Sequence, residues 1–193
     1  MDSKGQLLWK STAIHNVWHV CVGNVWGDGS PQIVTTSAKG KVHVFGSDGK
    51  KRKDLDAGCY PFMVRVSMPS GKDKAATVLV AGPALGGEAD PKTVILAAIS
   101  GDGTKQWSVE LPAGTTPYVN SAYLAHGKSW LAVAIRGGQV HVVDIERGEM
   151  IASVSDQGMS AEVGWATGKD AGSPLLLVAT GSKLNAFRVA SPK

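Results

Sequence analysis

Short apolar stretches recur along the whole chain, and many of them alternate apolar with polar residues. Examples are QIVTTS from Gln32, KVHVF from Lys41 and AEVGWA from Ala161. Alternation of this kind predicts β-strands. No stretch keeps apolar residues at helical spacing for three turns, and 24 glycines interrupt the pattern. We therefore expect an all-β protein with no helix longer than two turns.

Four segments repeat one form, in which a strand, a tight turn and a second strand are followed by glycine. Taking Val42, Val94, Val140 and Leu184 as equivalent positions, the spacings are 52, 46 and 44 residues, which is the length of a four-stranded blade. Two further short strands precede each segment. The repeat predicts a four-bladed β-propeller over the single domain 1–193. Its blades cover approximately residues 13–56, 57–113, 114–157, and 158–193 together with 1–12.

The two ends of the chain complement one another. The fourth unit stops after its third strand, LNAFRVASPK, and the chain opens with GQLLWKS. Joined, they reproduce the form of TVILAAISGDGTKQWSVEL, with Trp9 where Trp107 falls. We therefore predict that the N-terminal strand completes the last blade, because an unpaired sheet edge invites aggregation. The same complementarity allows closure in trans, as a homodimer in which each chain is half of an eight-bladed propeller. A piece of a longer propeller is a third alternative.

The repeats carry a polar turn followed by a tryptophan on the next strand. LAAISGDGTKQW contains Trp107, AFRV combines with GQLLW and its Trp9, and HVVDIERGEM has Met150 instead. In these stretches the chain resembles the quinoprotein-like propellers, which contain PQQ-like repeats. The resemblance implies a propeller architecture. The dehydrogenases of that family add a catalytic aspartate, acidic metal ligands and adjacent cysteines around a quinone, and Cys21 and Cys59 are not neighbours here.

The stretch NVWGDGSPQIVTTSAKGKVHVF resembles the calcium loops of integrin-type propellers, the FG-GAP repeats. Calcium prefers six to eight oxygen ligands. Asn24 and Asp28 could supply oxygens, but Trp26 and Gln32 stand where that family has carboxylates. We expect a structural turn at this position.

Charge and composition narrow the classes of partner. The net charge of +4 is smaller than nucleic-acid binding usually requires. Basic residues 50–53 follow the turn dipeptide Asp48-Gly49 and are expected on an exposed hairpin. No apolar run reaches the roughly 18 residues that cross a membrane, so no membrane partner is expected. Cys21 and Cys59 predict two buried free thiols or, alternatively, one disulfide.

Two features of the sequence bear on the cellular compartment of the protein. The first residues, MDSKGQLLWKS, lack the pattern of a secretory signal peptide. The family resemblance would favour an extracytoplasmic location if the chain is a fragment of a longer one.

Catalytic motifs are not found in the sequence. It has no GxSxG elbow and no phosphate-binding glycine loop opening a helix. His43 and His141 occupy the same repeat position, which indicates a structural role. His15 and His19 would lie roughly 13 Å apart on one strand face, too far apart to share a zinc ion. We therefore predict no catalytic residue, metal or cofactor.

Alignment of the first strand in each unit predicts the candidate site. The residues at one level are Asn16, Phe62, Tyr118 and Glu162, with His15 just before; those one level deeper are His19, Arg65, Ser121 and Trp165. Such a mixture forms a polar and aromatic pocket at the mouth of a propeller channel; alternatively, these side chains only satisfy one another. We expect a non-catalytic binding or scaffold module for a protein partner. The alternative is a sensor or enzyme domain that binds a sugar or quinone there.

Overall fold

The computed structural model describes residues 6–12, 14, 16–37, 40–67, 74–85, 93–114, 116–155, 158, 161–166 and 174–190. These residues form fifteen β-strands in four antiparallel sheets and no helix. The all-β prediction is therefore confirmed. A helix with the length and apolarity needed to cross a membrane is not found in the described part of the chain.

Each sheet is a meander of consecutive strands. Sheet 1 contains β1 (Val17–Gly23), β2 (Gln32–Ser37), β3 (Val42–Phe45) and β4 (Lys51–Leu55). Sheet 2 contains β5 (Met63–Val66), β6 (Val78–Gly82), β7 (Thr93–Ile99) and β8 (Lys105–Pro112). Sheet 3 contains β9 (Val119–Leu124), β10 (Trp130–Ile135), β11 (Gln139–Asp144) and β12 (Glu149–Val154). Sheet 4 contains β13 (Glu162–Ala166), β14 (Leu175–Thr180) and β15 (Lys183–Arg188).

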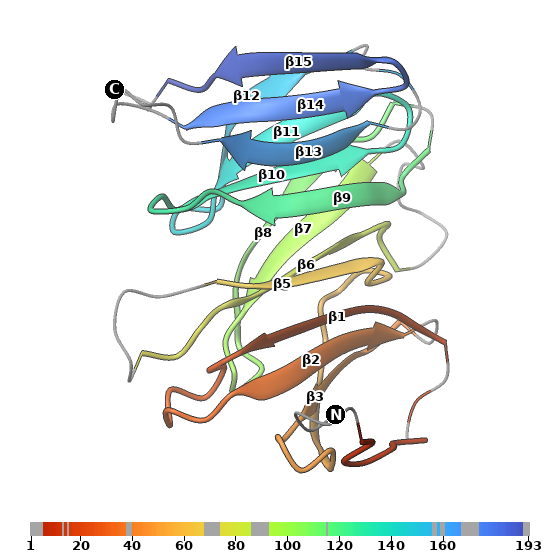
Figure 1. Ribbon diagram of the computed structural model, residues 1–193, viewed down its shortest axis with the longest axis vertical. Helices are drawn as coiled ribbons and strands as arrows, with labels where there is room; N and C mark the ends of the chain where they lie inside the picture. The colour runs from red at the N-terminus through yellow and green to blue at the C-terminus, as the bar shows by residue number, and fades with distance from the viewer. Residues whose placement is uncertain are drawn as a thin grey trace.

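The four sheets follow one another along the long axis of the molecule, from sheet 1 at the bottom of Figure 1 to sheet 4 at the top. Their first strands lie close together, with β1 against β5, β5 against β9 and β9 against β13. Contacts between outer strands are fewer, as between β8 and β12. Sheets that converge on their first strands and separate at their last form a propeller-like arrangement.

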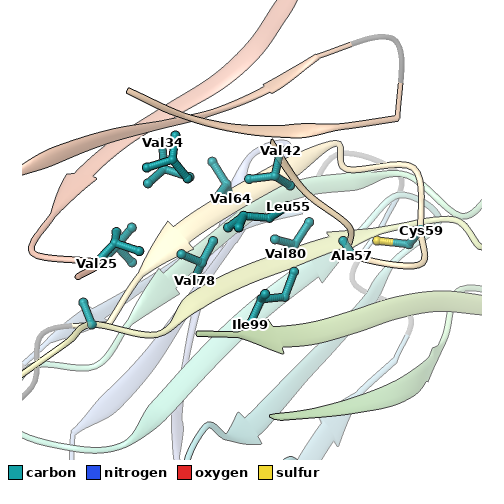
Figure 2. Close-up of a cluster of buried hydrophobic side chains, with 13 residues drawn as sticks. Val25, Val34, Val42, Leu55, Ala57, Cys59, Val64, Val78, Val80 and Ile99 are labelled. Atoms are coloured by element: carbon teal, nitrogen blue, oxygen red, sulfur yellow. The ribbon is translucent and has the colours of Figure 1, made fainter. Parts of the chain in front are cut away.

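Each pair of neighbouring sheets buries a hydrophobic cluster. Figure 2 shows the cluster between sheets 1 and 2, where Val34 and Val42 face Val64, Val78 and Val80. All five side chains are fully buried. Because burying one such side chain contributes about 1.5–3 kcal/mol, the interface between sheets is a main source of stability.

The strands keep a common register from sheet to sheet. The third-strand residues Val42, Leu96, Val140 and Leu184 pair with Thr36, Ala81, Ala134 and Ala179 of the second strands. The equivalent of Val42 in sheet 2 is therefore Leu96, two residues beyond the expected Val94. A shift of two residues leaves the buried face unchanged, because side chains alternate with a period of two.

Two local predictions are confirmed. Asp48-Gly49 lies in the turn between β3 and β4, with Gly49 at φ 74°. Basic residues 50–53 lie at the start of the exposed strand β4 or just before it. Cys21 and Cys59 are both free thiols, the second fully buried and the first partly.

The N-terminal segment does not complete the last sheet, so the prediction of closure within one chain is wrong. Residues 6–12 form no strand, and the indole Nε1 of Trp9 donates to Ser47 O of sheet 1 at 3.1 Å. Figure 1 places residues 6–12 beside sheet 1, at the opposite end of the molecule from sheet 4. The physical reason is that each sheet packs on only one or two neighbours, and four sheets stacked in this way do not bring sheet 4 back to sheet 1.

Candidate functional site

A row of aromatic rings crosses the first strands of sheets 1 to 3. Trp18 stacks on Phe62 with ring centroids 4.4 Å apart and planes 10° apart. Phe62 in turn contacts Tyr118 at 4.6 Å and Tyr60 at 6.4 Å. Trp18, Tyr60 and Tyr118 are exposed and Phe62 is half-buried. These four residues, defined here as the aromatic row, therefore present one continuous apolar surface to solvent.

Similar local turns position Phe62 and Tyr118. Each follows a proline, and each donates its backbone N–H to the carbonyl two residues earlier, at 2.9 Å in both cases. Proline presets the backbone for such a turn. The turn places each ring just before its strand, β5 or β9, which explains why two side chains 56 positions apart in the chain meet.

Arg65 joins three of the sheets beside the aromatic row. Its Nε donates to Ala122 O of β9 at 2.7 Å, and its Nη1 donates to Val64 O at 2.9 Å. The same Nη1 lies 3.0 Å from both ring nitrogens of His19 on β1. The guanidinium also lies over the Tyr123 ring, 5.2 Å from its centroid.

Electrostatics keep His19 neutral. Because arginine can only donate hydrogen bonds, the ring of His19 must accept one from Arg65 and is unprotonated at that nitrogen. Burial lowers the pKa of His19, and the charge of Arg65 lowers it further. Burial also lowers the pKa of Arg65, although that residue stays charged at physiological pH.

The remaining expected site residues lie apart from this cluster or serve the framework. Ser121 is buried and its Oγ accepts the Val163 N–H at 3.1 Å. Trp165 donates its Nε1 to Tyr123 O at 2.8 Å. Glu162 and Asn16 are exposed, Asn16 with an unusual φ of 51°. His15 lies outside the described residues.

The strand register differs from the expected alignment. His19, Met63, Ser121 and Glu162 pair with equivalent residues of the second strands and so share one level. Arg65 lies two residues beyond this level on the same face, and Trp165 lies three residues beyond it on the opposite face. A slip of one residue transfers a side chain to the other face of the sheet, which explains why Trp165 packs toward Trp130 of sheet 3.

Sequence reasoning missed Trp18, Tyr60 and Tyr123. All three are exposed aromatic residues on the first strands or just before them. Trp18 was visible in the segment VWHVCV, where an aromatic residue at the strand edge is the signal. Trp18 meets Phe62 by stacking between two sheets, and the repeat positions within one strand do not show such a contact.

Sheet 1 contains a Ser–His–Asp arrangement that the sequence did not reveal. The Nε2 of His43 lies 3.0 Å from Ser37 Oγ, and its Nδ1 lies 2.6 Å from Asp54 Oδ1. Catalysis would require an accessible nucleophile, but Ser37 is only 1% exposed. The equivalent His141 contacts a backbone carbonyl, Pro112 O, at 2.7 Å. The arrangement is therefore a framework of hydrogen bonds on the face of a sheet.

The loop that resembles calcium repeats is closed by its own side chains. Gln32 Oε1 accepts the N–H groups of Val25 and Trp26, at 2.6 and 3.2 Å. Asp28 Oδ1 accepts the Ser30 N–H and lies 3.3 Å from Gln32 Nε2. Asp28 Oδ1 and Gln32 Oε1 thus stabilise the turn itself, as expected for a structural turn. The described residues contain no cluster of three or more His, Cys, Asp or Glu suited to a metal.

A cavity of about 410 Å³ lies at the outer face of sheet 1, away from the aromatic row. Its lining comes from the N-terminal segment and from sheet 1 and its turns: Leu8, Trp9, Val22, Pro31, Ile33 and Ser47. This lining is mostly apolar, and residues 6–12 cover only part of the face.

Comparison with known proteins supports the fold. No family model and no curated protein sequence matches the chain. Among solved structures, the chain is similar to a crystal structure of BBS1N in complex with ARL6DN, soaked with mercury, with a TM-score of 0.58 and 18% sequence identity. The similarity covers 89% of this chain and 47% of that chain, so this chain spans about half the length of that neighbour. At this identity only the propeller-like fold is shown, and the quinoprotein-like resemblance stays a prediction.

Proposed function

We propose that this protein is a non-catalytic interaction module that binds a protein partner along the first strands of its sheets. The observation that carries the proposal is the aromatic row, in which Trp18, Phe62 and Tyr118 from three sheets form one partly exposed surface. Tryptophan, tyrosine and arginine are the residues most enriched at the energetic centres of protein interfaces.

The structure of the aromatic row suits a rigid binding surface. Each ring is held by a strand or a proline turn, and stacking fixes Trp18 against Phe62. A surface ordered in advance loses little conformational entropy when a partner binds. The hydrogen bonds of Arg65 are directed to other parts of the framework. The row therefore favours apolar or aromatic side chains of the partner over carboxylates.

The structural neighbour gives the proposal a second, weaker support. BBS1N was crystallised in complex with another protein, ARL6DN. A fold of this type can thus present a surface to a protein, and the same class of activity is proposed for this chain without transfer of the partner itself.

The experiment compares partner capture by the wild-type protein with capture by Trp18→Ala, Tyr118→Ala and the control Met150→Ala. Met150 is exposed on β12, an outer strand of sheet 3, away from the aromatic row. Proteins crosslinked to each variant are quantified by mass spectrometry, and the affinity of a recovered partner is then measured with purified components.

We expect the Trp18 and Tyr118 variants to lose at least about 30-fold in affinity, because truncating a central aromatic residue typically costs 2 kcal/mol or more. The Met150 variant should bind like the wild type. Equal binding by all four proteins would contradict the proposal. A thermal shift with a sugar or quinone that depends on Trp18 would instead favour the small-molecule alternative.

A further inference from the structure

The N-terminal segment docks on sheet 1 as an outer strand docks on the next sheet. Trp107 of β8 donates its Nε1 to Ile145 O, in the turn between β11 and β12 of sheet 3, at 3.0 Å. Trp9 makes the equivalent bond to Ser47 O, in the turn between β3 and β4 of sheet 1, at 3.1 Å. Both indoles also lie beside a glycine of the turn they contact. Residues 6–12 thus occupy the place of the last strand of a sheet that precedes sheet 1.

The face of sheet 1 beneath this segment is built as a contact between sheets. Thr35 and His43 on this face are buried, but the part that β1 contributes is uncovered. Val20 and Val22 on β1 pair with Thr35 and Ile33, as Val64 and Val66 pair with Val80 and Val78 in sheet 2. Val64 and Val66 are 0% and 8% exposed, because sheet 1 covers them. Their equivalents Val20 and Val22 are 56% and 55% exposed.

Sheet 4 shows the complementary gap at the other end of the molecule. No described segment pairs with the outer edge of β15. Leu184 on this strand is 68% exposed, whereas its equivalent in sheet 2, Leu96, is fully buried against sheet 3. Ala186 is likewise exposed, whereas its equivalent Ala98 is fully buried. Among the described residues, sheet 4 is therefore paired with no fourth strand and packed against no following sheet.

We propose that these two ends bind each other between two copies of the chain. Sheet 4 of one copy packs on this face of sheet 1 of the other, against the uncovered Val20 and Val22. Residues 6–12 of the second copy add to β15 of the first as its fourth strand. Trp9 then lies opposite Ala186, as Trp107 lies opposite Ala98 in sheet 2. Two such contacts join two chains into one ring of eight sheets.

A second copy fits because one chain carries both halves of the contact. The two surfaces that meet are different: residues 6–12 with sheet 1 on one copy, and β15 of sheet 4 on the other. The contact is therefore head-to-tail. Head-to-tail contacts close into rings when the rotation between copies allows it. Pairing would also cover the exposed edge of β15, which is otherwise a template for aggregation. The proposal does not depend on the aromatic row, and its experiment measures mass and crosslinking, not partner binding.

The first experiment measures the solution mass of the full chain over a range of micromolar concentrations by light scattering and sedimentation. The wild type should have twice the monomer mass of 20.1 kDa. Leu184→Lys should be monomeric at the same concentrations, because a charge would be buried in the contact. Circular dichroism verifies that this variant is folded, as expected for a side chain exposed within one copy. The control Met150→Lys, on an exposed outer strand, should remain dimeric.

The second experiment tests the strand pairing directly. Copies with Lys10→Cys are mixed with copies with Asn185→Cys, because the register of β7 and β8 places these positions opposite each other. The mixture should form a disulfide-linked heterodimer, whereas neither variant alone should form a disulfide-linked dimer.

Three results would overturn the proposal. The first is a wild-type chain that stays monomeric at 100 µM, which would leave a different protein or further chain as the occupant. The second is a dimer that survives Leu184→Lys and forms no mixed disulfide. The third is a series of larger assemblies with the mixed disulfide, which would retain the contact but refute the two-copy ring.

Discussion

Arg65 gives the most direct test of how the first strands are held together. Replacing it with glutamine removes the charge and shortens the side chain, so the bonds to Ala122 O and His19 and the contact with Tyr123 are lost. A hydrogen bond from a charged group contributes about 1.5–3 kcal/mol and a cation–π contact about 0.5–1 kcal/mol. Since Arg65 is only half-buried, we expect Arg65→Gln to lower the free energy of unfolding by about 2–3 kcal/mol in total.

The assay is urea unfolding followed by tryptophan fluorescence and circular dichroism. With a slope of about 1–3 kcal/mol per molar urea, the midpoint should fall by roughly 0.7–3 M. The matched control is Arg52→Gln, because Arg52 pairs with the exposed Asp48 at 2.8 Å and joins no two sheets. This control should leave the midpoint nearly unchanged. If both variants shift the midpoint equally, the bridging role of Arg65 is refuted.

Three further outcomes are expected. Burial lowers the pKa of His19 below 6.5, so the unfolded chain binds more protons than the folded chain as the pH falls, and the free energy of unfolding should decrease on acidification from pH 7.5 to 5.5. Urea midpoints should decrease less for His19→Gln than for the wild type over this pH range. An equal decrease in both proteins would contradict this cause. A Cβ on Gly82 would lie 1.6 Å from a backbone carbonyl oxygen, so Gly82→Ala should destabilise by at least about 2 kcal/mol in thermal melts, whereas Gly164→Ala, with nothing within 4 Å, should not. Burial raises the pKa of Cys21 and of Cys59 to about 12, so both thiols should react with Ellman's reagent at pH 8 far more slowly in the native protein than in urea; a fast native reaction at either thiol would contradict this.

The candidate site was predictable in part. The repeat indicated the first strands and, on them or next to them, Phe62, Tyr118, His19 and Arg65. In the structure Phe62 contacts Tyr118, and Arg65 contacts His19. It misplaced Trp165, because the number of residues between a turn and its strand varies between sheets and a single inserted residue changes the face. The contribution of Trp18 depends on stacking between sheets, which no alignment within one strand reveals.

The sequence by itself determined the strands, their turns and the four-fold repeat, because alternation of side chains and turn chemistry depend on residues close together in the chain. It also identified Trp9 as the equivalent of Trp107, and both indoles do occupy equivalent turns. Only the tertiary structure decided which sheet receives Trp9 and that the two ends of one chain stay apart. Those outcomes depend on the rotation between packed sheets. This rotation is set by packing between residues distant in sequence, so no single segment determines it.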